Sequence, residues 1–223
     1  MNQERMVATS TSTSVLETNK VLRNTYMLLS MTLLFSGAVA GLSMALNLPY
    51  PGMIITLVGY FGLLFLTTKF RDSSMGLVFV FALTGFMGYT LGPIINAYTH
   101  AFTNGNQLVM MALGGTGVIF LGLSGYALVS RKDFSFLGAS LTIGILVAFL
   151  AGLGAVFFNM PGLSLAVSAM FVLLMSGLIL YQTSEIIHGG ETNYIMATVT
   201  LYISIYNLFL SLLQLLGAFA GED

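Results

Sequence analysis

The stretch TNYIMATVTLYISIYNLFLSLLQLL, residues 192–216, decides the fold that this sequence predicts. It is apolar and long enough to cross a bilayer as one α-helix, which takes about 20 residues. Polar side chains recur along it at steps of 4, 3, 4 and 3, which places them on one face of a helix. They are Thr200, Ser204, Asn207, Ser211 and Gln214. Lipid offers such groups no partner, so we expect this helix to be central, packed on its neighbours or lining a wet cavity.

The composition is that of an integral membrane protein. Of the 223 residues, 57% are hydrophobic and 7% are charged, whereas a soluble domain carries about a quarter charged residues. The apolar runs are continuous and do not alternate with polar residues, which favours helices over a β-barrel. We therefore expect an all-α polytopic membrane protein.

Seven apolar runs are each about long enough to cross the hydrocarbon core as a helix. Turn-forming residues separate them, as in NLPYP and NMPG. The runs cover residues 25–46, 50–68, 75–97, 107–130, 137–158, 162–187 and 192–216. The sequence thus predicts a seven-helix transmembrane domain over residues 21–218.

The basic residues set the expected orientation. With seven crossings, all of them fall on one side, which the positive-inside rule makes cytoplasmic. They are Arg5, Lys20, Arg23, Lys69, Arg71, Arg131 and Lys132. We expect residues 1–20 to form a flexible cytoplasmic tail and residues 219–223 a short acidic tail in the periplasm.

Small residues predict which helix faces meet. Gly88 and Gly92 lie four residues apart in the third run. Ser140, Gly144, Ala148 and Gly152 recur every fourth residue in the fifth. Small side chains at this spacing let helix backbones approach closely in lipid.

Several classes of function lack their residues. The chain has no cysteine, which excludes disulfides and Fe–S clusters. It has two histidines, His100 and His188, and no His-rich motif, so we expect no metal site. There is no basic cluster for nucleic acid, no phosphate-binding loop and no H-E-x-x-H motif. We expect no cofactor and no enzymatic activity.

Three segments carry a resemblance to a known family. They read GYTLGPIINAY (88–98), ALGGTGVIFLGLSGYAL (112–128), and LILYQTSEII (178–187) followed by LYISIYNLFLSLLQLLG (201–217). In this order the chain resembles the Bax inhibitor-1 family, also called the transmembrane Bax inhibitor motif family, over nearly its whole length. The resemblance implies six helices wrapped around a central C-terminal seventh.

The resemblance also implies positions for an ion gate. Some family members are pH-dependent calcium leak channels in which two facing aspartates titrate as a coupled pair. Carried over onto this chain, these positions are Gln182 and Ser204, and a basic residue that latches one aspartate would be Lys69 or Arg71. Gln and Ser neither titrate near neutral pH nor bring negative charge to a cation. The gate's acids are therefore missing here.

A second implication concerns a partner. A bacterial member of the family is described as a modulator of the membrane-anchored ATP-dependent protease FtsH. The resemblance therefore implies a regulatory protein of the bacterial inner membrane, with lipid and FtsH as partners and residues 1–19 as an end that the protease can grip. The alternative is a leak or transporter of Ca²⁺ or H⁺ along the polar stripe of residues 200–214.

Glu185 is the candidate for a displaced acid, because it lies three residues beyond Gln182 on a neighbouring part of the same helix face. We favour instead a Glu185 that is solvated or paired with a basic residue at the cytoplasmic end. By that point the helix has risen about 35 Å, which exceeds the ~30 Å hydrocarbon core. For the same reason we expect His188 in an exposed loop.

The motif GLSG, residues 122–125, is similar to the nucleophile motif of rhomboid intramembrane serine proteases. Such catalysis would need His188 within hydrogen-bond reach of Ser124. Ser124 is expected about 10 Å inside the membrane, whereas His188 is expected outside it. We therefore interpret these small residues as packing residues.

Overall fold

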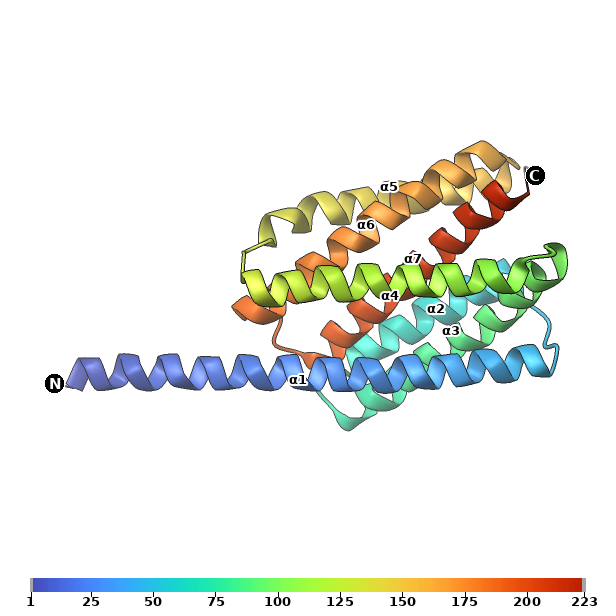
Figure 1. Ribbon diagram of the computed structural model, residues 1–223. Helices are drawn as coiled ribbons and strands as arrows, with labels where there is room; N and C mark the ends of the chain where they lie inside the picture. The colour runs from blue at the N-terminus through green and yellow to red at the C-terminus, as the bar shows by residue number, and fades with distance from the viewer. Residues whose placement is uncertain (1, 222–223) are drawn as a thin grey trace.

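The computed structural model describes the backbone of residues 2–221 and the side chains of residues 20–221. This part of the chain is helical between its connections and contains no strand. Its elements are α1 (Asn2–Ala45), α2 (Met53–Lys69), α3 (Ser74–Ala101), α4 (Gly105–Ser130), the short 3-10 helix η1 (Ser135–Leu137), α5 (Gly138–Phe157), α6 (Pro161–His188) and α7 (Tyr194–Ala220) (Figure 1). The all-α fold with seven apolar helices is confirmed.

The structure describes the two predicted tails only in part. The backbone of α1 begins at Asn2, so most of the segment 1–20 continues the first helix. That this segment is flexible stays a prediction, and side chains before Lys20 lie outside the described residues. Of the predicted acidic tail, Glu222 and Asp223 also lie outside the described residues.

Six of these helices are long and apolar enough to cross a membrane, and α2 is shorter. Its 17 residues rise about 25 Å, somewhat less than the hydrocarbon core. Pro49 and Pro51 keep the chain before it extended. Gly52 then turns the backbone at φ 91°, a conformation that favours glycine, and the helix starts at Met53.

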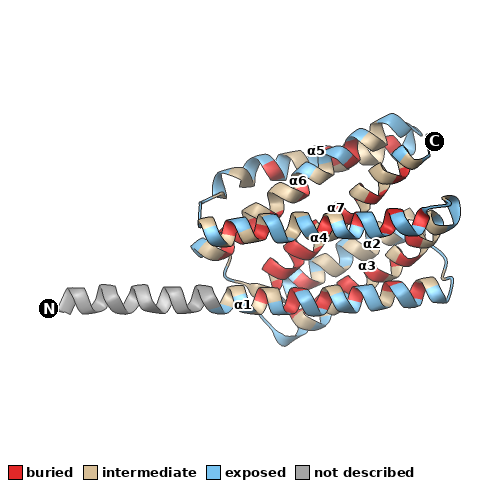
Figure 2. Cartoon of the chain, viewed as in Figure 1, coloured by how far each residue is buried: buried red, intermediate tan, exposed pale blue. Residues whose placement is uncertain are grey.

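Helix α7 is at the centre of the bundle. It packs against α1, α3, α4 and α6, whereas α2 packs on α3 and α5 packs on α6. Each of the three clusters of buried apolar side chains contains a fully buried leucine of α7, namely Leu201, Leu213 and Leu208. Figure 2 shows buried positions along much of α7, while α5 is largely exposed or intermediate. The predicted central position of the seventh helix is confirmed.

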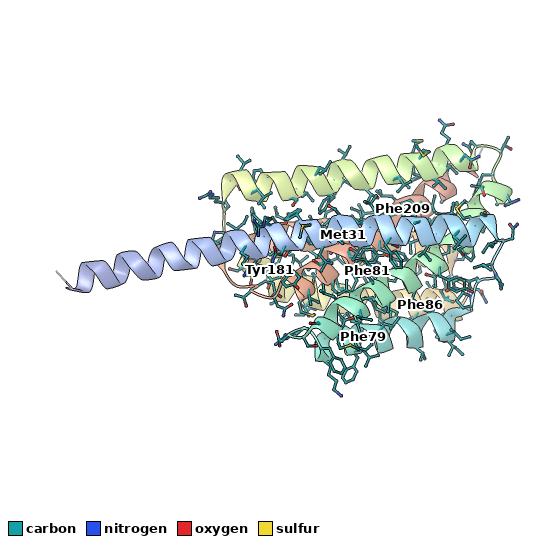
Figure 3. All side chains as sticks on the ribbon, turned by 90° about the horizontal axis from the view of Figure 1, so that it is seen from below. Met31, Phe79, Phe81, Phe86, Tyr181 and Phe209 are labelled. Carbon is teal, nitrogen blue, oxygen red and sulfur yellow. The ribbon has the colours of Figure 1, made fainter. Side chains whose placement is uncertain are left out.

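Small residues bring the helix backbones together, as predicted. A methyl group on Gly88 of α3 would overlap the carbonyl oxygen of Ser36 on α1, and one on Gly92 would meet Ser43. The ring of Phe86, labelled in Figure 3, lies over Gly59 of α2 in the same close manner. The contact between α1 and α3 is thus fixed by the main chain itself.

The predicted stripe on α5 is correct at three of its four positions. Gly144 lies against Leu174 of α6, Gly152 faces Val167 of α6, and Ala148 is fully buried. Ser140 is exposed, and its hydroxyl donates to the carbonyl of Leu137. Ser140 lies in the first turn of α5, where its hydroxyl bonds the chain that enters the helix.

We expect the substitution Gly88→Ala to destabilise the bundle by about 1–3 kcal/mol, because the added methyl group overpacks a backbone contact. The measurement is the melting temperature of the purified chain in detergent. Gly114→Ala on α4 is the matched control, since nothing lies within 4 Å of its added methyl group. Equal melting temperatures for wild type and Gly88→Ala would contradict the close α1–α3 contact.

Candidate functional site

The connections α2–α3, α4–α5 and α6–α7 meet at one end of the bundle, on the left in Figure 1. We call it the basic end, because it carries the Lys and Arg residues whose side chains are described. These are Lys20, Arg23, Lys69, Arg71, Arg131 and Lys132. Hydrogen bonds from Asn193 to Arg71 and from His188 to Arg131 join the three connections directly. The basic residues therefore share one end, while the side of the membrane that this end faces stays a prediction.

The two positions that the resemblance assigns to an ion gate are buried and uncharged. Gln182 on α6 is 5% exposed, and its Nε2 finds no hydrogen-bond partner among the described residues. Ser204 on α7 is fully buried and donates to the carbonyl of Thr200 in its own helix at 2.8 Å. Within residues 20–221 no hydrogen bond joins the two side chains. An amide and a hydroxyl can hydrogen-bond here, but they cannot titrate.

The side chains of the polar stripe of α7 are all buried or partly buried, so the stripe faces the interior of the bundle. Asn207 donates to the carbonyl of Ile203, one turn earlier, as Ser204 does to Thr200. Gln214 makes contacts between helices, since it accepts from Ser168 at 2.7 Å and donates to Ser164 at 2.6 Å. Ser211 is buried. The stripe thus combines bonds within α7 and one pairing with α6.

A second polar line on α7 was not predicted. Thr198, Tyr202 and Tyr206 follow one another at steps of four residues. The Tyr202 hydroxyl lies 2.6 Å from that of Ser36 on α1, and the Tyr206 hydroxyl lies 3.1 Å from that of Thr90 on α3. Thr198 donates to its own helix and to the carbonyl of Thr25 on α1. The spacing is visible in the sequence, and the signal lies in the hydroxyl groups of two tyrosines that are otherwise apolar.

Three hydroxyl groups from distant parts of the chain meet near the basic end. The Tyr26 hydroxyl contacts those of Ser124 on α4 and Thr183 on α6, and the latter two lie 3.3 Å apart. Nearby in α1, the hydroxyl of Thr25 is buried without a partner among the described residues. This cluster ties α1, α4 and α6 together through hydrogen bonds between hydroxyl groups.

Ser124 and His188 are not brought together. The hydroxyl of Ser124 is bonded to Tyr26 and Thr183. His188 contacts Ser184 and the carbonyl of Arg131. The geometry that an activated serine nucleophile needs is therefore not formed by this pair.

The two candidate latch residues are exposed at the basic end and do not contact Gln182. The ammonium group of Lys69 lies over the ring of Phe70, 5.7 Å from its centroid. The guanidinium of Arg71 pairs with Asp72 at 3.5 Å. Lys69 is the last residue of α2, and Arg71 lies in the connection between α2 and α3.

Asn193, which was not predicted, holds that connection to the start of α7. Its side-chain oxygen caps the helix by accepting from the amides of Ile195 and Met196, both at 3.0 Å. Its Nδ2 donates to the carbonyl of Arg71 at 3.1 Å and to the carboxylate of Asp72 at 2.8 Å. An Asn directly before an apolar run is an N-cap signal that was available in the sequence.

Glu185 lies one turn before the end of α6 and is half-buried, with its carboxylate against Gly190. Glu185 was expected to be either solvated or paired with a basic residue, and the pairing does not form, since Arg71 with Asp72 is the one salt bridge among the described side chains. His188 is exposed, as expected, but it is the last residue of α6 and not part of a loop. Its ring contacts the backbone of the α4–α5 connection, which the sequence did not indicate.

Within the described part of the chain, no group of three or more His, Asp or Glu side chains could hold a metal ion. The buried polar groups are hydroxyls and amides, which donate and accept hydrogen bonds without changing charge. In the described part of the chain, these buried groups therefore serve packing and hydrogen bonding between helices.

Comparison with known proteins gives a consistent result. The sequence model of the family described as inhibitor of apoptosis-promoting Bax1 matches residues 18–221. A protein of Escherichia coli strain K12 named modulator of FtsH protease YccA is 53% identical over 99% of this chain and 100% of its own length. Its counterpart in E. coli O6:H1, with the same identity and coverage, is named inner membrane protein YccA. An uncharacterized protein of Pseudomonas aeruginosa is 56% identical over 93% of both chains.

We expect Asn193→Ala to lower the stability of the bundle by about 1 kcal/mol or more, because a helix loses its cap and Asp72 loses its donor. The measurement is again the melting temperature in detergent. Asn104→Ala is the matched control, since Asn104 occupies the N-cap position of α4 without a side-chain capping bond. If both variants melt at the same temperature, Asn193 does not carry the role assigned to it.

Proposed function

The chain belongs to the Bax inhibitor-1 family, and from this premise we propose that it is a regulatory protein of the bacterial inner membrane that binds and modulates the FtsH protease. The main support is the E. coli relative that is named a modulator of this protease, which is 53% identical over 99% of this chain. On this proposal the protein acts as a partner of an enzyme and has no catalytic activity of its own. Its N terminus faces the cytoplasm and its C terminus the periplasm, in line with the positive-inside rule.

The observation that favours a regulator over an ion gate is the chemistry of the gate positions. Gln182 and Ser204 are both buried and cannot ionise. The Gln182 nitrogen that lacks a partner is a hydrogen-bond donor, which does not coordinate a cation. A bundle without acids in its centre has no charge there to attract Ca²⁺ or to pass a proton.

The close packing of α1 suggests how such a protein could occupy the protease. An ATP-driven protease that grips residues 1–19 would first have to pull α1 away from α3 and α7. That interface contains the close approach of Gly88 to the main chain of Ser36 and the hydrogen bond between the hydroxyls of Ser36 and Tyr202. Slow extraction of α1 would keep the protease engaged and spare other substrates.

A leak of Ca²⁺ or H⁺ is the second candidate function. Its route would follow the polar stripe of α7, with Asn207 as a contact and Glu185 as the displaced acid. Asn207 is only partly buried, and the carboxylate of Glu185 is not engaged in a salt bridge within the described residues. These two observations are compatible with a leak, although the Nδ2 of Asn207 already donates to the carbonyl of Ile203.

We expect FtsH to co-purify with the affinity-tagged chain from E. coli membranes solubilised in mild detergent, as read by immunoblot. An unrelated polytopic inner-membrane protein with the same tag and expression level is the control, and it should recover only background amounts. Equal recovery with both proteins would contradict binding.

Deletion of residues 2–15 tests, in the same strain, whether this segment is needed for degradation of the chain. The deletion should lengthen the half-life of the chain after protein synthesis is stopped, because the protease loses the end that it grips. In cells that lack FtsH, the full-length and shortened chains should decay alike. An unchanged half-life of the shortened chain in cells that contain FtsH would exclude residues 2–15 as the grip.

We expect liposomes that contain the purified chain to show no Ca²⁺ or proton flux above protein-free liposomes between about pH 5 and pH 8, where a coupled carboxylate gate would respond. Fluorescent dyes inside the liposomes measure the flux. A pH-dependent flux would favour the leak function instead. In that case Glu185→Gln should abolish the pH response if Glu185 is the displaced acid.

A further inference from the structure

His188 ends α6 with both of its ring nitrogens directed at backbone carbonyl groups. Nδ1 lies 2.9 Å from the oxygen of Ser184, and Nε2 lies 3.1 Å from the oxygen of Arg131. A carbonyl oxygen only accepts hydrogen bonds, and a neutral imidazole carries a single N–H. Both contacts are hydrogen bonds at the same time only when the ring is a protonated imidazolium.

Ser184, one turn earlier, makes the arrangement sensitive to the loss of that proton. Its hydroxyl accepts from the amide of Phe134 at 3.0 Å and donates to the carbonyl of Lys132 at 3.2 Å. It also lies 3.3 Å from Nδ1 of His188. Once Nδ1 has lost its proton it becomes an acceptor, and it then competes with Lys132 for the single hydroxyl proton of Ser184.

The segment held by these bonds is the connection that links α4 to α5. It begins at Arg131, whose backbone adopts the left-handed conformation at φ 50°, a region that L side chains rarely occupy. The connection leads into α5, which packs on α6 at the edge of the bundle. Bonds from His188 and Ser184 to Arg131, Lys132 and Phe134 therefore hold this connection against the end of α6.

The groups that face His188 carry charges of both signs. The ring lies at the C-terminal end of α6, near the last carbonyl groups of that helix. In the connection, hydrogen bonds from Ser135 and the field of His188 lower the pKa of Asp133, so its carboxylate stays ionised. Glu185 on α6 and Glu191 after it add negative charge to this end. The nearby cations, Arg131 and Lys132, are exposed to solvent and screened.

We propose that His188 is a protonation-dependent clamp, whose imidazolium fixes the α4–α5 connection to the end of α6 and whose neutral form releases it. Histidine is the side chain that changes charge between pH 5 and pH 8. The clamp is complete on the acidic side of this range, where both ring nitrogens donate. It loosens as the pH rises, because the neutral ring keeps only one N–H donor. The deprotonated Nδ1 then accepts the hydroxyl proton of Ser184, which weakens the bond from Ser184 to the carbonyl of Lys132.

The test is amide hydrogen exchange of the peptide that contains Phe134, measured on the full chain in detergent at about pH 5.5 and about pH 8. Exchange is expressed as a protection factor, which removes the intrinsic dependence of the exchange rate on pH. We expect the protection of this peptide to fall about tenfold at the higher pH, as when a hydrogen bond to a charged group is lost.

His188→Gln should abolish this difference and give the low protection at both values, because a glutamine amide does not change its protonation state. His188 is exposed, so this variant should keep the fold. His100→Gln is the matched control. It removes the other histidine of the chain, whose Nδ1 contacts Asn96 within α3, and it should behave as wild type. Protection that does not depend on pH in the wild type, or that still depends on pH in His188→Gln, would overturn the proposal.

Discussion

A polar side chain in hydrocarbon has no water to bind, and the position of α7 follows from this constraint. Polar groups lie on two faces of the helix, the stripe from Thr200 to Gln214 and the line formed by Thr198, Tyr202 and Tyr206. Both faces must be covered by protein. Helices α1, α3, α4 and α6 cover these two faces. At the edges of the bundle, α2 packs on α3 and α5 packs on α6. Because lipid gives helices no hydrophobic drive to associate, the cover depends on close contacts such as the one at Gly88.

The sequence was sufficient for features that repeat with the helical period. Apolar runs predicted the seven helices, the spacing of Ser204 and Ser211 predicted a buried face, and Gly88 predicted a close contact. It was insufficient where partners are far apart in the chain. Tyr26 meets Thr183 across 157 residues, and no local pattern indicates which hydroxyl of another helix will face it. Hydroxyls such as Ser204 also bonded within their own helix, so a polar stripe predicts burial better than it predicts contacts between helices.

The distribution of charge separates this chain from the family's ion gates. Where side chains are described, ionisable acids, bases and histidines lie at the two ends of the bundle, and the middle contains hydroxyls, amides and apolar groups. The acid and base residues concerned are Lys20, Arg23, Lys69, Arg71, Asp72, His100, Arg131, Lys132, Asp133, Glu185, His188 and Glu191. Sensitivity to pH therefore belongs to its ends.

The bonds that hold the α4–α5 connection end on main-chain atoms, and this affects how the segment can evolve. Ser184 and His188 contact the backbone of Arg131, Lys132 and Phe134 and not their side chains. Substitutions in this segment therefore leave its anchors in place, whereas inserting or deleting a single residue would move each carbonyl and amide out of reach. We expect homologues to tolerate drift in the identity of these residues while keeping the length of the connection constant.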